Sequence, residues 1–275
     1  MPMLSQTRIE IVAPLPERGR ICHALFDFDG TLSLIRRGWR EVMIPMMVEI
    51  LRDLETGETE EELTALVAEF VDRLTGKQTI YQMMALAEAV RERGGEPLDP
   101  LDYKWQYLKR LEARIEGRVT ALQEGRVEPE AMMVPGALEM LEAVRARGVA
   151  CYLASGTDEP YVWAEAELLG VTPYFCSIHG ALDDYKSYSK KRVIDRIIEE
   201  NDLSGAEFAG FGDGFVEIEN VKAVGGIAVG VASNEDTLQG VNAWKRERLI
   251  RAGADIIIPD FREHEKLVAY LFPKE

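Results

Sequence analysis

Two aspartates separated by a single residue are the strongest chemical feature of this sequence. Asp27 and Asp29 belong to the segment Asp27-Phe28-Asp29-Gly30-Thr31, which directly follows a short apolar run. A carboxylate can attack a phosphorus centre and form an acyl-phosphate, which divides one difficult displacement into two easier ones. A second carboxylate two residues later could protonate the leaving group and then activate water. The pair is therefore suited to nucleophilic and acid–base chemistry on a phosphate ester.

Further acidic groups follow another apolar run and point to a metal ion. Asp213 stands in Gly212-Asp213-Gly214, and Glu217 comes four residues after it. Two carboxylates about 4 Å apart repel each other by about 4 kcal/mol at an effective dielectric constant of 20. If these groups meet the aspartate pair, they need a cation to stay ionised together. A set of ligands made only of oxygen atoms favours Mg²⁺.

The same segments contain groups that could hold a phosphoryl anion. Gly30 allows a tight turn, so that backbone N–H groups can face the oxygens of a phosphoryl group. The hydroxyl of Ser155, in Ser155-Gly156-Thr157, follows a separate apolar run. Together with a lysine, it would stabilise the negative charge that develops during transfer.

The elements that must position these groups are short strands alternating with helices. Apolar runs of strand length occupy residues 21–26, 149–154, 174–178, 206–211, 227–231 and 255–258. Helical patterns lie between most of them, which predicts an α/β fold with a doubly wound parallel, Rossmann-like sheet. Ligands of such sheets bind outside the carboxyl ends of the strands. The polar clusters described above fall at those ends.

A long helical segment interrupts this alternation. Apolar residues recur at helical spacing in three stretches between residues 34 and 132, and Thr59 with Glu62 predicts a capping box before the first stripe. No strand pattern occurs there. We therefore expect an α/β core domain formed by residues 1–33 and 133–275, with an all-helical cap domain at 34–132 inserted into it.

Four motifs in a fixed order resemble those of the haloacid dehalogenase-like (HAD) hydrolase superfamily. Asp27-Phe28-Asp29-Gly30-Thr31 resembles its first motif, and Leu153-Ala154-Ser155-Gly156 resembles its second. Lys190 resembles the third, and Gly212-Asp213 through Glu217 resembles the fourth. The similarity extends from about residue 20 to residue 272. It implies a phosphatase with a helical cap between motifs one and two.

The resemblance also implies roles for individual residues. In the family, the first aspartate is the nucleophile and the second is the acid–base, which assigns these roles to Asp27 and Asp29. The phosphoryl group is bound by the second and third motifs, here Ser155, Gly156 and Lys190. The metal is held by acids of the first and fourth motifs, here Asp27, Asp29 through its backbone carbonyl, Asp213 and Glu217.

Two of these assignments have alternatives. Glu217 stands where the family more often has aspartate, so that contact with Mg²⁺ through water is an alternative to direct ligation. Lys186 and Lys191 also precede the helix that begins near Lys190. Lys190 has the register that best matches the family, immediately before the apolar pattern of the helix.

The substrate that we expect is a small phosphomonoester, such as a sugar phosphate. A cap over the site would limit access for large polymers. Arg36 and Arg37 follow motif one, where the chain leaves the core, and Lys77 and Gln78 stand in a turn between two cap helices. These four residues are candidates for substrate specificity, although a surface position would also explain them.

Three other functions are compatible with parts of the pattern. A phosphomutase shares the motifs and the helical cap, although Thr31 slightly favours a phosphatase. A dehalogenase of the same superfamily needs neither the acid–base at Asp29 nor magnesium, so the carboxylate pair argues against it. A non-enzymatic binding or regulatory protein would be favoured if Asp27, Asp29 or Asp213 were replaced, and none of them is.

Composition narrows the class of partner. The 275 residues carry a formal net charge of −16, which argues against nucleic-acid binding because phosphate backbones are held by Lys and Arg. The three cysteines are far apart and form no metal-binding pair.

No signal peptide or membrane-length apolar stretch is recognised, so a cytoplasmic enzyme without a membrane partner is expected. The pattern does not indicate an oligomeric state.

Overall fold

The fold is described from a computed structural model that covers residues 3–15 and 17–273. The chain forms two compact units. One contains the chain up to Arg37 and again from Ala121, and is called the core unit; the other is Gly38–Thr120, called the helical unit. The residue range predicted for the cap, 34–132, includes the whole range of the helical unit. That this unit serves as a cap stays a prediction.

The core unit is built on one sheet, which contains seven strands within the described residues, in the order β1-β7-β6-β5-β2-β3-β4. All neighbouring strands are parallel except β1, which is antiparallel to β7. The strands are β1 Glu10–Ile11, β2 His23–Phe26, β3 Ala150–Asp158, β4 Ser177–Ala181, β5 Phe208–Gly212, β6 Ile227–Val231 and β7 Ile256–Ile258. The predicted α/β class with a mostly parallel sheet is thus confirmed.

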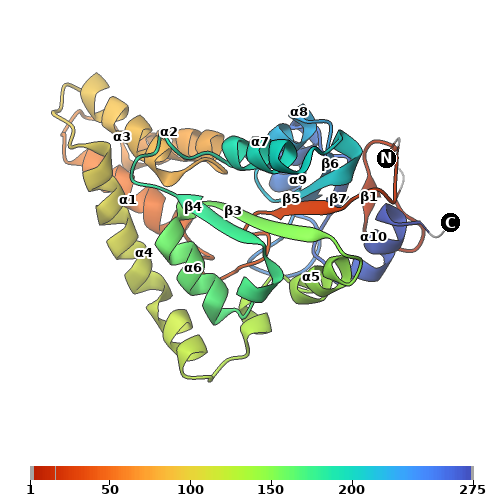
Figure 1. Cartoon of the computed structure of the whole chain (residues 1–275). Coiled ribbons are helices and arrows are strands. Elements are labelled where there is room, and N and C mark those ends of the chain that lie inside the picture. The colour runs from red at the N-terminus through yellow and green to blue at the C-terminus, as the bar shows by residue number, and fades with distance from the viewer. Residues whose placement is uncertain (1–2, 16, 274–275) are drawn as a thin grey trace. The chain divides into compact units, whose positions relative to one another are not determined.

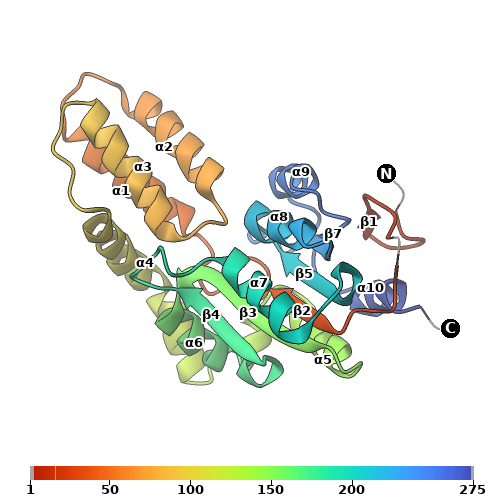
Figure 2. The same cartoon turned by 45° about the horizontal axis from the view of Figure 1, so that its top comes forward.

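Helices cover both faces of this sheet, as Figures 1 and 2 show. One face carries α5, α6 and α10, and the opposite face carries α7, α8 and α9. Their bounds are α5 Ala137–Arg145, α6 Glu159–Leu168, α7 Lys190–Asn201, α8 Phe215–Ala223, α9 Ala243–Arg251 and α10 His264–Leu271. Short 3-10 helices lie at Pro129–Met132, Thr172–Tyr174 and Gly205–Glu207. The sheet is doubly wound, as expected for right-handed crossovers.

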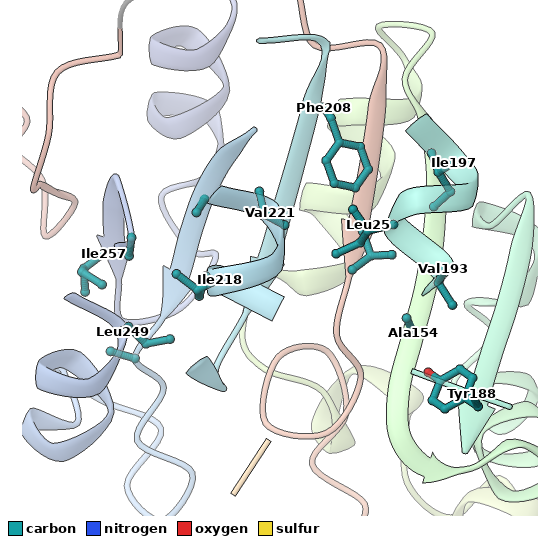
Figure 3. Close-up of a cluster of buried hydrophobic side chains, with 14 of the residues drawn as sticks. Leu25, Ala154, Tyr188, Val193, Ile197, Phe208, Ile218, Val221, Leu249 and Ile257 are labelled. Carbon is teal, nitrogen blue, oxygen red and sulfur yellow. The ribbon is translucent and has the colours of Figure 1, made fainter. Parts of the chain in front are cut away.

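Alternating side chains of β2 and β5 anchor the two faces of the sheet. Leu25 and Phe208 are fully buried in a cluster with Val193 of α7 and Ile218 of α8 (Figure 3). On the other face, Phe26 of β2 stacks on its register partner Phe211 of β5, with ring centroids 4.6 Å apart. Phe26 directly precedes Asp27, and Phe211 comes two residues before Asp213, so this stack fixes where the polar strand ends lie.

The winding of the sheet reverses between β2 and β5. These strands are neighbours in the sheet. In the core unit, α5 lies between β2 and β3 in the chain and α8 lies between β5 and β6, and these two helices are on opposite faces of the sheet. A crevice forms at such a switch point outside the carboxyl ends of the strands. Asp27 follows β2 and Asp213 follows β5, so both acids stand at this position.

Two strand predictions need correction, and one strand was missed. The strand expected at 174–178 begins at Ser177, because Thr172–Tyr174 forms a 3-10 turn around Pro173. The strand expected at 149–154 continues to Asp158, since its far end pairs with β4 across an irregular register. β1 was not predicted. It has two residues, and its pairing with β7 gives it a structure that its own sequence does not indicate.

The helical unit contains α1 Arg40–Arg52, α2 Glu60–Leu74, α3 Thr79–Glu92 and most of α4 Pro100–Gln123. The predicted capping box is present: the Thr59 side chain accepts from the Glu62 N–H, and Glu62 accepts from the Thr59 N–H. Pro45 lies inside α1. Within residues 3–15 and 17–273, no helix is both long enough and apolar enough to cross a membrane.

We predict that Phe211→Ala destabilises the protein by about 3–5 kcal/mol, because it removes a buried ring and leaves a cavity against Phe26. The measurement is the free energy of unfolding in urea. Trp163→Ala is the control, because the Trp163 side chain is 47% exposed and its loss should cost about 0.5 kcal/mol or less. Equal losses of stability from the two substitutions would contradict the stabilising role of the Phe26–Phe211 stack.

Candidate functional site

The loop after β2 is folded tightly against the end of β5. The Asp27 N–H donates to the Phe211 carbonyl at 2.9 Å, which continues the strand pairing, and the Gly30 N–H donates to the Ser33 carbonyl at 2.9 Å. Gly30 has φ +74°, and a Cβ atom at this position would overlap Oδ2 of Asp213. Glycine is therefore required here both by the backbone conformation and by the space that Asp213 occupies.

Asp27 is the buried centre of the site. Its side chain is almost inaccessible, and Oδ1 accepts hydrogen bonds from the Phe28 N–H at 2.8 Å and from Lys190 Nζ at 2.8 Å. Burial raises the pKa of Asp27 well above its usual range, the Lys190 charge opposes this effect, and the charges of Glu217 and Asp213 add to it. A further cation beside Asp27 would favour its ionised form.

Lys190 joins two acids that come from different strand ends. It is the first residue of α7, which is capped by Ser189 through the Arg192 N–H. Its Nζ lies 2.9 Å from Oε2 of Glu217, as well as 2.8 Å from Asp27. Burial alone would lower the pKa of Lys190, but these two carboxylates raise it above its usual range.

The neighbouring lysines lie elsewhere. Lys191 pairs with Asp195 on the exposed side of α7, and Lys186 lies over the Tyr185 ring. Among the three predicted candidates, the structure thus brings Lys190 to Asp27.

The acids at this edge form a set that fits a divalent cation. Asp27, Asp213 and Glu217 each offer a carboxylate oxygen, and the three oxygens lie within 4.8 Å of one another. Glu217 is fully buried, and its Oε1 accepts from the Gly214 N–H at 2.6 Å. The donors are all hard oxygens, which suits Mg²⁺. The Asp29 carboxylate is not part of this group.

Asp213 is held by a lysine that sequence reasoning missed. Lys245 Nζ lies 2.7 Å from Asp213 Oδ2, 2.6 Å from Glu235 Oε1 and 3.0 Å from Ser233 Oγ. Ser233 in turn donates to the Gly30 carbonyl at 2.6 Å. Burial raises the pKa of Asp213 to about 6, and the Lys245 charge opposes this effect. One buried ammonium therefore ties together the segments after β2, β5 and β6.

Asp29 faces two hydroxyl groups of β3. Thr157 Oγ1 donates to Asp29 Oδ2 at 2.8 Å, and Ser155 Oγ donates to the same oxygen at 3.3 Å. Gly156 lies between these residues in β3. The structure therefore brings the predicted Ser155 and Gly156 to the same side of the site as Asp29, and it adds Thr157.

The candidate specificity residues occupy varied settings. Arg36 is buried and contacts Glu165 of α6 at 2.7 Å, and Arg37 donates to the Glu235 carbonyl at 3.1 Å. Burial raises the pKa of Glu165 to about 7, and the Arg36 charge opposes this effect. In the helical unit, Lys77 lies over the Tyr81 ring and Gln78 is buried just before α3.

Weak signals for the missed residues are present in the sequence. Thr157 lies two positions after Ser155, which is the spacing of side chains on one face of a strand. Lys245 follows Asn242, which caps α9 by accepting from the Lys245 N–H at 3.0 Å. A capping residue predicts that a helix starts there, but it does not predict that the lysine in its first turn reaches an acid after β5.

Comparison with known proteins shows the family of the chain. A family model described as haloacid dehalogenase-like hydrolase matches residues 23–225. Because this match covers most of the chain, the protein belongs to the haloacid dehalogenase-like hydrolase family. No curated protein matches the chain.

Solved structures share the fold at low sequence identity. One is a predicted phosphoglycolate phosphatase from Haemophilus somnus, with a TM-score of 0.59 and 16% identity, covering 90% of this chain and 98% of that one. Another is a β-phosphoglucomutase from Clostridium difficile, with a TM-score of 0.59, 13% identity and coverages of 91% and 98%. CbbY from Rhodobacter sphaeroides, solved with phosphate, has a TM-score of 0.54, 19% identity and coverages of 88% and 96%.

We predict that Lys245→Met lowers the free energy of unfolding by about 3–5 kcal/mol, because it leaves Asp213 and Glu235 without their shared buried cation. Urea unfolding measures the change. Lys191→Met is the matched control, since its exposed pair with Asp195 should contribute about 0–1 kcal/mol. A loss at Lys245 no larger than that of the control would show that the buried ion pairs do not support the fold.

Proposed function

We propose that this protein is a Mg²⁺-dependent phosphatase that hydrolyses a small phosphomonoester through a phospho-aspartate at Asp27. The observation that carries the proposal is the placement of Asp27, buried in contact with Lys190 and beside Asp213 and Glu217 at the switch point of the sheet. A nucleophilic carboxylate needs a positive setting of this kind to approach an anionic ester.

The reaction has two transfers. In the first, a carboxylate oxygen of Asp27 bonds to phosphorus while the bond to the ester oxygen breaks, and Asp29 gives its proton to the leaving oxygen. In the second, Asp29 takes a proton from water, which attacks the acyl-phosphate and releases phosphate. Lys190 keeps positive charge at Asp27 throughout, and Ser155 with Gly156 is assigned to the phosphoryl oxygens. Mg²⁺, held by Asp27, Asp213, Glu217 and the Asp29 carbonyl, would neutralise charge on the transferring group.

The substrate class follows from the family and from the expected cap. The R. sphaeroides protein with the same fold was solved with phosphate, which supports a small phosphorylated ligand here. If Gly38–Thr120 serves as a cap, it would exclude polymers and could supply Lys77 and Gln78 to the substrate. Arg36 and Arg37 remain candidates at the start of that connection.

A phosphomutase is the second candidate, because a β-phosphoglucomutase shares the fold with a TM-score of 0.59. Both activities would begin with transfer to Asp27. They differ in the acceptor of the phosphoryl group, which is water in one and a sugar hydroxyl in the other. Assays of sugar phosphates for free phosphate and for isomeric sugar phosphate separate them. Formation of an isomeric sugar phosphate without free phosphate would show that the protein is a phosphomutase and not a phosphatase.

We predict that Asp27→Asn reduces turnover of phosphate esters by at least about 1,000-fold, because the amide cannot act as the nucleophile. Release of inorganic phosphate is the measurement, with circular dichroism as a check of the fold. Asp195→Asn, on the exposed side of α7, is the matched control and should keep normal activity. Persistent Mg²⁺-dependent turnover in Asp27→Asn would refute the nucleophile assignment.

Metal dependence gives a separate prediction. Activity should disappear with a chelator and return with Mg²⁺, and Asp213→Asn should raise the dissociation constant for Mg²⁺ at least about tenfold, because it removes a charged ligand. Titration calorimetry measures binding without turnover. Asp195→Asn again serves as the control. Unchanged Mg²⁺ affinity in Asp213→Asn would exclude Asp213 as a ligand.

A further inference from the structure

The two oxygens of the Asp29 carboxylate have very different surroundings. Oδ2 receives the hydroxyl of Thr157 at 2.8 Å and that of Ser155 at 3.3 Å. Oδ1 is also buried, but it has no hydrogen-bond partner among the residues that the structure describes. Because both hydroxyls donate to Oδ2, Oδ1 is the Asp29 oxygen that can face a leaving group.

The local backbone explains why both hydroxyls reach the same oxygen. β3 continues past Ser155 to Asp158 with an irregular register, and the hydroxyls of Ser155 and Thr157 both face Asp29. The Thr157 N–H donates to Ser155 Oγ at 3.0 Å, which leaves the Ser155 hydroxyl proton for the hydrogen bond to Asp29. Tyr188 donates to the Ser155 carbonyl at 2.8 Å and holds the strand from the other side.

We propose that Thr157 is a positioning residue for the acid–base Asp29. Its hydroxyl donates to Oδ2 at 2.8 Å, which leaves Oδ1 as the oxygen that exchanges a proton with the reacting atoms. This assignment rests on the proposed phosphatase function, and it adds a residue that the family motifs do not include in this sequence.

The assignment defines the proton transfer. As the bond between phosphorus and the ester oxygen breaks, the proton moves from Oδ1 of Asp29 to that ester oxygen, which departs as an alcohol. The electron pair of the O–H bond stays on the carboxylate, whose negative charge is then stabilised by the hydrogen bond from Thr157 to Oδ2. Without the Thr157 hydroxyl, only the longer contact from Ser155 at 3.3 Å holds Oδ2, so the carboxyl group can rotate and turn Oδ1 away from the leaving oxygen.

The consequence depends on the leaving group. An alkyl alcohol is a poor leaving group and needs the proton, whereas 4-nitrophenolate leaves readily without it. Acid catalysis of this kind contributes about 100- to 10,000-fold. The parameter that reports it is kcat/KM, because this ratio covers only the steps up to the first irreversible transfer and excludes hydrolysis of the phospho-aspartate.

The test compares Thr157→Val, which keeps the shape without the hydroxyl, with Thr157→Ser, which keeps the hydroxyl. With β-glycerol phosphate as the alkyl ester, kcat/KM should fall about 10- to 100-fold in Thr157→Val and less than about threefold in Thr157→Ser. With 4-nitrophenyl phosphate, both variants should stay within about threefold of the natural protein. Thr157→Ala provides a second hydroxyl-free variant if the valine is poorly tolerated in β3.

Two results would overturn the positioning role. One is an equal loss on both esters in Thr157→Val, which would indicate general damage to the site. The other is a serine variant as impaired as the valine variant. If the natural protein releases phosphate from neither ester in the presence of Mg²⁺, the proposed phosphatase function fails, and the role of Thr157 fails with it.

Discussion

Like charges brought together out of water are the constraint on which this structure depends. Asp27, Asp213 and Glu217 place three carboxylate oxygens within 4.8 Å of one another, and Lys190 and Lys245 are the buried cations that they contact. Each lysine bridges acids from different segments, so each also fixes the distance between loops. These two lysines contact four acids at this edge, Asp27, Asp213, Glu217 and Glu235, so acidic groups outnumber basic ones. Such an excess of buried negative charge favours the binding of a further cation.

The sheet controls this arrangement through packing rather than through polar contacts. Phe26 and Phe211 stack as register partners on one face, and Leu25 and Phe208 are buried on the other. A shift of one residue in either strand would exchange these faces and would move the acids that follow. The apolar core therefore determines where the charged groups at the strand ends lie.

The fold and the principal acids were predictable from the sequence because both depend on local patterns. Apolar runs mark parallel strands, and the residues at their ends meet at one edge whatever the remaining details are. The choice of Lys190 among three lysines needed the family register, and its contact with Glu217 needed the structure. Thr157, Lys245 and β1 were missed because their roles come from partners far away in the chain. In these cases the tertiary structure supplies the information that the local sequence lacks.

The order in which the strands are made has a consequence for biosynthesis. β2 occupies the centre of the sheet, yet its partners His23↔Ala150 and His23↔Phe208 show that both neighbours are synthesised much later. During translation the apolar β2 segment stays unpaired until the helical unit and then β3 have been synthesised, and its second neighbour, β5, follows later still. Long-range pairing of this kind slows folding and exposes strand edges to association with other chains. The helical unit is one continuous segment, so it can become compact on the ribosome and shorten the effective distance across which β2 must find β3.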